Sequence, residues 1–181
     1  NRSAASKEIR KRLLPFMRAG DLPRNIVLIG GPPCQAYSIV GRSRNKGTLG
    51  YKAEADHRHF LYLEYLHVIG EFEPAVFVME NVKGILTSRV ADEQMFSKIV
   101  EDLKRPDIAS DSGDRGLEYV LVALGGRHER LFDLDPKDFI VQAEQIGVPQ
   151  ARHRVIVCGV RKDVFEKAGG VRSLTGLRAP T

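Results

Sequence analysis

Blocks of apolar residues alternate with polar segments along the chain and predict strands interleaved with helices. Short continuous apolar runs typical of buried strands cover residues 26–30 and 75–79. Longer segments with apolar residues every three to four positions indicate helices. We expect helices at residues 3–18, 60–72 and 92–103, a polar loop at 105–116, and further strands at 119–123, 139–143 and 155–160. This order predicts an α/β fold with a mostly parallel sheet and flanking helices.

Chain length and cysteine use narrow the class of protein. The 181 residues, 43% of them hydrophobic, can bury one substantial core. We find no run of 18 apolar residues and no basic leader, so we expect a soluble cytoplasmic protein rather than a membrane protein. The two cysteines, Cys34 and Cys158, lie far apart in sequence, which argues against a disulfide framework. Cys158 lies within the last apolar run, where we expect it to pack as a strand residue.

Positive charge is concentrated in the first third of the chain. The net charge is +5, but residues 1–58 hold 12 basic and 4 acidic residues, whereas residues 59–181 hold 16 and 19. Much of this excess follows Cys34 in a segment punctuated by glycines, residues 39–58, which we interpret as a mobile basic loop. Such a loop suits a polyanionic partner. The alternative is a solvated loop whose charge only keeps the protein soluble.

Cys34 is a candidate nucleophile because of the loop in which it lies. The segment Gly30–Ser38, GGPPCQAYS, directly follows a predicted buried strand, and open α/β sheets bind their ligands where strands end. Prolines stiffen this loop, while Gly30 and Gly31 let the main chain bend. The alternative is that Cys34 is simply a small buried hydrophobic residue.

Two further segments place polar and charged side chains, which are candidates for a functional site, at the same edge of the predicted sheet. Glu80 follows the strand at 75–79, where a partly desolvated carboxyl group can act as a hydrogen-bond donor or proton carrier. Its alternative role is to bind backbone amides or to pair with an arginine. Gln150, Arg152 and Arg154 alternate before the last strand, so their side chains should share one face and suit a heteroaromatic ring or phosphates. The alternative here is a charged edge strand.

Three ordered motifs, GGPPCQAYS, MENVKG and GVPQARHRV, resemble those of the cytosine-5 DNA methyltransferase family. They span residues 30–155, and the predicted helix at 60–72 matches the family's helix between the first two. The resemblance implies a Rossmann-like fold that uses S-adenosylmethionine, no metal, and double-stranded DNA from which a cytosine is flipped out. It also implies a bacterial, nucleoid-associated enzyme that works with a cognate restriction endonuclease in a restriction-modification system.

The resemblance also implies individual roles. Cys34 would be the nucleophile, Glu80 would contact the base edge, and Arg152 and Arg154 would hold the ring and the loop. Cofactor contacts would come from Pro33 and Leu61. Further substrate contacts would come from Gln35, Ser38, Asn81 and Gln150.

Parts of the family pattern are missing, which leaves other interpretations open. We see no glycine-rich cofactor turn before Gly30, and no target-recognition region after Val160. We therefore expect residues 1–181 to be the C-terminal half of a catalytic domain, with a catalytic loop at 39–58 and an insertion at 88–118, and the isolated fragment to be inactive. The alternatives are a methyltransferase of the same family acting on transfer RNA, a nucleic-acid-binding fragment without catalysis, and an unrelated thiol hydrolase using His57 or His59 as base.

Overall fold

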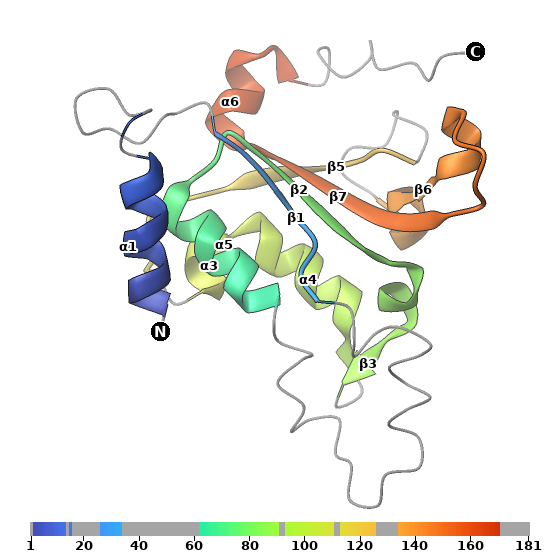
Figure 1. The fold of residues 1–181 in the computed structure, drawn as a ribbon, viewed down its shortest axis with the longest axis horizontal. Helices are drawn as coiled ribbons and strands as arrows, with labels where there is room; N and C mark the ends of the chain where they lie inside the picture. Colours follow the sequence, from blue (N-terminus) through green and yellow to red (C-terminus); the bar gives the residue numbers. More distant parts are fainter. Residues whose placement is uncertain are drawn as a thin grey trace, which may run out of the picture.

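A five-stranded sheet organises the described part of the chain, with helices α3, α4 and α5 on one of its faces (Figure 1). The computed structural model describes residues 2–13, 15, 26–33, 62–90, 93–110, 113–125 and 134–170. Its helices are α1 (Arg2–Leu13), α3 (Tyr62–Phe72), α4 (Met95–Lys104), α5 (Pro106–Ala109) and α6 (Lys162–Lys167). Its strands are β1 (Val27–Gly30), β2 (Val76–Val82), β3 (Arg89–Val90), β4 (Glu93–Gln94), β5 (Tyr119–Ala123), β6 (Ile140–Gln142) and β7 (His153–Arg161). Three 3-10 helices are η4 (Lys83–Thr87), η5 (Pro136–Phe139) and η6 (Ala143–Ile146).

The strand order explains why segments far apart in sequence meet at one end of the sheet. β1 pairs parallel with β2, β2 pairs antiparallel with β7, and β7 pairs antiparallel with β5 and β6. Among the described strands of this sheet, β1, β2, β5 and β6 therefore share one direction, and β7 runs against them. Because β7 is reversed, its first residues lie beside the last residues of β2. The predicted α/β class is confirmed, although most of the neighbouring strand pairs are antiparallel.

One face of the sheet is buried beneath the helices and forms the core. Alternate residues of β2 and β7 point to this face, as the two-residue period of a strand requires. Phe77, Met79, Val155 and Val157 are each at most 1% exposed. α4 meets them with a stripe of apolar residues, as an amphipathic helix does. The buried residues of α4 are Met95, Phe96, Ile99 and Leu103.

The opposite face of β1 and β2 remains largely uncovered. Val27 is 57% exposed and Ile29 is 75% exposed, although both belong to a strand. Their register partners on β2, Val76 and Val78, are half-buried. Glu80 follows on this same face of β2. We call this surface the open face.

The structure extends or corrects several predicted elements. The strand expected at 75–79 continues to Val82, because β2 stays paired with β7 through the pair Val82 and Arg154. The expected loop at 105–116 contains the short helix α5, which has Pro106 in its first turn, where a missing N–H is tolerated. The helix expected at 3–18 is described as far as Leu13. α6 has no counterpart among the predicted elements.

The segment expected to be an insertion, residues 88–118, supplies β3, β4, α4 and α5. Asp107 organises its second half, although its carboxylate is fully buried. It accepts hydrogen bonds from the backbone N–H groups of Arg115 and Leu117 at 2.9 and 3.1 Å, and from that of Ile108 at 3.0 Å. Whether this segment is an insertion relative to other family members stays a prediction.

Candidate functional site

Glu80 and Arg154 lie side by side on the open face. Glu80 is opposite Ile156 and Arg154 is opposite Val82, so the two charged residues are diagonal neighbours on adjacent strands. The Nε atom of Arg154 is 2.7 Å from Oε1 of Glu80. The same nitrogen makes no aligned hydrogen bond, so charge rather than directed hydrogen bonding holds the pair. The Arg154 side chain is 25% exposed and the Glu80 side chain is 43% exposed, so the carboxylate is accessible.

The segment after β1 lies close to the carboxylate of Glu80. A Cβ atom at Gly31 would lie 3.3 Å from Oε2 of Glu80, so glycine allows the main chain to approach the carboxylate. On the buried side, the Asn81 side chain is only 2% exposed and donates a 3.3 Å hydrogen bond to the carbonyl of Pro32. Its Oδ1 accepts a 2.9 Å hydrogen bond from the backbone N–H of Val82. Gly31 and Pro32 are thus fixed against both faces of the end of β2.

Tyr65 on α3 fixes the strand just before this segment. Its hydroxyl donates to the carbonyl of Val78 at 3.0 Å and lies 3.5 Å from that of Leu28, so it contacts both β1 and β2. A Cβ atom at Gly30 would lie 2.6 Å from the Tyr65 ring, which explains the glycine. Burial raises the pKa of Tyr65, so its hydroxyl keeps the proton it donates. Sequence patterns gave no sign of this role, because Tyr65 matches an ordinary helix position.

Gln150 and Arg152 lie on the turn that leads from η6 into β7, and both are exposed. This turn is well braced. The N–H of Ala143 donates to the carbonyl of Arg152 at 3.0 Å, and Nε2 of His153 lies 2.6 Å from Oε1 of Glu144. Arg154 alone among the three alternating residues contacts Glu80 in the described part of the chain.

The predicted site residues therefore fall into three groups. Glu80, Asn81 and Arg154 are brought together with the segment that ends at Pro33, which is exposed. Gln150 and Arg152 stand nearby in sequence on the braced turn. Outside the described residues lie Cys34, Gln35, Ser38 and Leu61.

Cys158 lies on the same face of β7 as Arg154, farther along the strand. It pairs with Val78 on β2 and with Val122 on β5, and it is half-buried. Burial raises the pKa of its thiol, which disfavours the reactive thiolate. Its expected role as a packed strand residue is confirmed.

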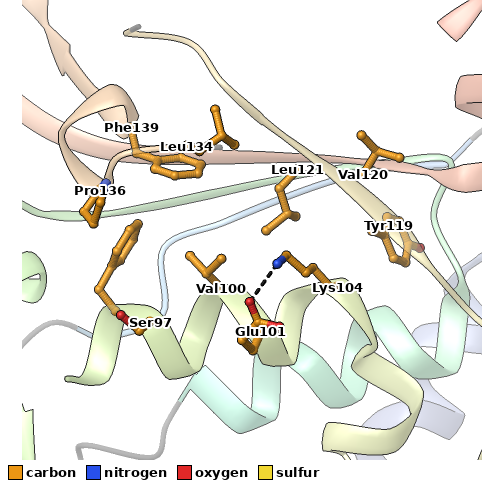
Figure 2. Close-up of a pocket in the computed structure, with 11 residues that line it drawn as sticks. Ser97, Val100, Glu101, Lys104, Tyr119, Val120, Leu121, Leu134, Pro136 and Phe139 are labelled. Carbon is orange, nitrogen blue, oxygen red and sulfur yellow. Dashed lines mark hydrogen bonds and ion pairs between the residues drawn. The ribbon is translucent and has the colours of Figure 1, made fainter. Parts of the chain in front are cut away.

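An apolar hollow lies elsewhere, between α4 on one side and β5 and η5 on the other (Figure 2). It has a volume of about 470 Å³, and apolar side chains such as Val100, Leu121 and Phe139 line it. Lys104 and Glu101 form a 2.7 Å ion pair beside it. Because it contains none of the predicted site residues, the hollow is separate from the chemistry at the end of β2.

Among the described residues, none of the helices is both long and apolar enough to cross a membrane. In that same part of the chain, histidine, cysteine and acidic residues form no group of three or more that is able to hold a metal ion.

Comparison with known proteins places these motifs in a family. The model of the C-5 cytosine-specific DNA methylase family matches residues 5–107. The type II methyltransferase M.Bpa9945I of Bacillus paralicheniformis is 38% identical over 136 residues, covering 75% of this chain and 25% of that protein. The DNA (cytosine-5-)-methyltransferase M.ApeKI of Aeropyrum pernix is 30% identical over 162 residues, covering 84% of this chain and 30% of that protein. The chain thus spans about a quarter to a third of the length of these curated relatives.

A solved structure supports the fold. A crystal structure from E. coli, described as a DNA modification methyltransferase encoded within a prophage, matches 91% of this chain and 33% of its own, with a TM-score of 0.50 and 24% sequence identity. Because the family model matches residues 5–107, more than half of the chain, the chain belongs to the C-5 cytosine-specific DNA methylase family.

Proposed function

We propose that this chain is part of a DNA cytosine-5 methyltransferase that methylates carbon 5 of a flipped cytosine through a covalent adduct with Cys34. The observation that carries the proposal is the pair of Glu80 and Arg154, whose carboxylate lies close to Gly31 in the segment Gly31–Pro33. This segment leads directly to Cys34. A nucleophile and a base-binding carboxylate thus come from neighbouring strand ends.

The residues divide the reaction between them. The thiolate of Cys34 adds to carbon 6 of the cytosine, which turns carbon 5 into a nucleophile. S-adenosylmethionine, to whose binding Pro33 and Leu61 are assigned, would supply carbon 5 with an electrophilic methyl group from its sulfonium and would leave as a thioether. Loss of the carbon 5 proton then returns the electron pair that breaks the bond to Cys34. The protein's task is to hold the ring while its charge distribution changes.

Glu80 and Arg154 suit that task. The Glu80 carboxyl group can hold the edge of the ring through hydrogen bonds with ring nitrogen N3 and the exocyclic amine, which are the groups that distinguish cytosine. Arg154, 2.7 Å away, holds the carboxyl group in place and supplies positive charge beside the ring. Asn81 fixes the backbone at Pro32, and we assign Gln35, Ser38, Gln150 and Arg152 to further substrate contacts.

We propose double-stranded DNA as the substrate. The basic excess in residues 1–58 suits a nucleic acid, and relatives are named as DNA (cytosine-5-)- or type II methyltransferases. We therefore set aside the transfer RNA alternative. We further propose that the parent enzyme acts on the bacterial nucleoid in the cytoplasm with a cognate restriction endonuclease.

The cofactor needs more protein than the described residues provide. Pro33 is exposed at the end of its segment and offers one wall, and Leu61 is assigned to the same role by the motif match. We propose that further parts of a longer protein add strands beside β1 and cover Val27 and Ile29, 57% and 75% exposed, to complete the cofactor half. Residues 39–58 would serve as the catalytic loop. The isolated 181-residue chain should then be inactive and bind little S-adenosylmethionine.

Matched cysteine variants of the full-length enzyme test the proposal. Cys34→Ser should abolish methyl transfer to duplex DNA, whereas Cys158→Ser, a half-buried strand residue, should retain most activity. If both variants lose activity and also fail to fold, the losses would show that the cysteines are needed for the fold, and they would not support a catalytic role for Cys34. Retained activity in Cys34→Ser, or methyl incorporation into transfer RNA alone, would refute the assignment. If calorimetry shows that the isolated chain binds S-adenosylmethionine with micromolar affinity, this would contradict the proposal that further parts of a longer protein are needed to complete the cofactor site.

A further inference from the structure

The turn between β6 and β7 carries exposed apolar residues that the proposed chemistry leaves unexplained. Ile146 is 55% exposed and Val148 is 43% exposed, and they flank Gly147. Scattered single apolar residues are ordinary on protein surfaces. Two large ones, one residue apart on a projecting turn, instead form a small apolar tip, which we define as Ile146 and Val148.

This tip is held rigidly. Gly147 has a φ of 85°, a conformation that glycine adopts without strain and that ends η6. The N–H of Val148 donates to the carbonyl of Ala143 at 3.1 Å, and the N–H of Gln150 donates to the carbonyl of Val148 at 2.7 Å. With the pair formed by Glu144 and His153, these bonds fix the tip without burying it. A surface that is fixed yet exposed is suited to a partner outside the described fold.

The tip stands at the reactive end of the sheet. β7 begins beside the end of β2, with Arg154 opposite Val82, and β6 pairs with the same first residues of β7. Figure 1 shows η6 and the turn beyond it at the end of the sheet where β2 also ends. Val148 precedes Arg154 by six residues, so at most about 20 Å of chain separates them. DNA that delivers a base to Glu80 and Arg154 therefore passes within reach of the tip.

The polar residues beside the tip favour nucleic acid as the partner. Exposed Gln150 and Arg152 follow it, and these side chains bind base edges and phosphates. Proteins that distort DNA insert apolar side chains such as isoleucine at base steps, where these chains replace lost stacking. Resting on the proposed function, we infer that Ile146 and Val148 contact the bases next to the flipped cytosine and stabilise the duplex that it leaves.

A comparison of two DNA substrates tests this role. One duplex pairs the target cytosine with guanine, and the other places it opposite an abasic site, where flipping costs less. In the full-length enzyme, the variant Ile146→Ala/Val148→Ala should lose about tenfold in kcat/KM on the paired duplex and less than twofold on the other. Methionine is larger than alanine and fills about the same space as isoleucine. The single variant Ile146→Met should therefore keep the activity on the paired duplex that the double alanine variant loses. The matched control is Ile108→Ala, which removes a 49% exposed isoleucine on α5 and should change neither rate.

The outcomes separate this inference from the proposed function. Equal losses on both substrates, or no loss on either, would overturn the inference, and equal losses would instead indicate a surface for another protein segment. Failure of the unaltered enzyme to methylate either DNA would refute the proposed function itself. Salt dependence gives a second check. Arg152→Ala should lower the salt slope of DNA binding by about one, whereas the apolar variant should weaken binding without changing that slope.

Discussion

The two faces of the sheet use the same strands for different purposes. On the covered face, Phe77 and Val155 are fully buried under the helices. On the open face, Glu80 and Arg154 form a charged pair, and Ile29 is 75% exposed. Because side chains alternate along a strand, β2 and β7 anchor the fold and present the candidate chemistry at the same time. Stability and function should therefore respond separately to substitutions one residue apart.

The largest effect is expected on the covered face at Phe77. Phe77→Ala in the 181-residue chain should lower the free energy of unfolding by about 3–5 kcal/mol, since it leaves a cavity between the sheet and the helices. Urea denaturation measures this loss. The control is Val78→Ala, the next residue along β2 and half-buried on the opposite face. A similar cost for both variants would show that the faces do not differ in packing.

A smaller but more specific effect is expected where Gly159 meets Phe77. The two residues are register partners, and a Cβ atom at Gly159 would lie 2.2 Å from the ring of Phe77. Gly159→Ala should cost about 1–3 kcal/mol through overpacking. Adding Phe77→Leu should recover part of this loss, a non-additivity that a double-mutant cycle measures. Simple additivity would mean that the close approach is not the cause.

Asp107 should make the free energy of unfolding depend on pH. Although burial alone would raise its pKa, hydrogen bonds from the backbone of Arg115, Leu117 and Ile108 hold the pKa of this carboxyl group below its usual value. A pKa lowered in the folded state stabilises the fold above the unfolded pKa, and this stabilisation is lost as pH falls below about 4. Asp107→Asn should cost about 1–3 kcal/mol at neutral pH, because an amide cannot accept all three bonds.

The measurement for Asp107 is the free energy of unfolding as a function of pH. The variant should show a flatter acid limb than the unaltered chain, since the titrating group is gone. Asp114→Asn is the matched control, because its carboxylate is largely exposed and pairs with Arg105 at the surface. An acid limb of unchanged steepness in Asp107→Asn would contradict the assignment.

The sequence predicts much of the framework and suggests candidate site residues, but it does not predict how the strands and these residues meet. Apolar runs identified β1, β2 and β7, because buried strands carry a strong local signal. They placed the end of β2 too early, since Glu80 and Asn81 are polar and stay in the strand only through pairing with β7. The reversed direction of β7, which brings Arg154 to Glu80, is a long-range property that no local pattern encodes.

Supporting residues were harder still to predict. Gly31 lies close to the Glu80 carboxylate and Gly30 lies close to the Tyr65 ring, so a Cβ atom at either position would crowd its neighbour. Only the folded geometry reveals those contacts. The short helix α5 was missed because its four residues lie in a polar segment whose order depends on the buried carboxylate of Asp107. Local propensity is weak evidence where one buried side chain organises the backbone.

A modest effect is expected at Tyr65, which links the covered face to the segment that leads to Cys34. Tyr65→Phe keeps the ring against Gly30 but removes the hydroxyl that donates to Val78. The free energy of unfolding should fall by about 0.5–1.5 kcal/mol, the usual net value of one hydrogen bond. Tyr65→Leu should cost more, because it also removes the ring. Equal costs for the two variants would show that the hydroxyl contributes nothing.

The smallest effect in the 181-residue chain is expected at Ile29, and it gives the sharpest test of the open face. Ile29→Ala should change the free energy of unfolding by no more than about 0.5 kcal/mol, because the side chain is largely exposed. If the rest of a longer enzyme covers this face, the same substitution in that enzyme should cost about 2–5 kcal/mol, as a buried isoleucine does. Urea denaturation of both proteins supplies the comparison, and Ile108→Ala on α5 should stay near neutral in each. A near-neutral Ile29→Ala in the longer enzyme would mean that the open face stays exposed there, and that the cofactor half packs elsewhere.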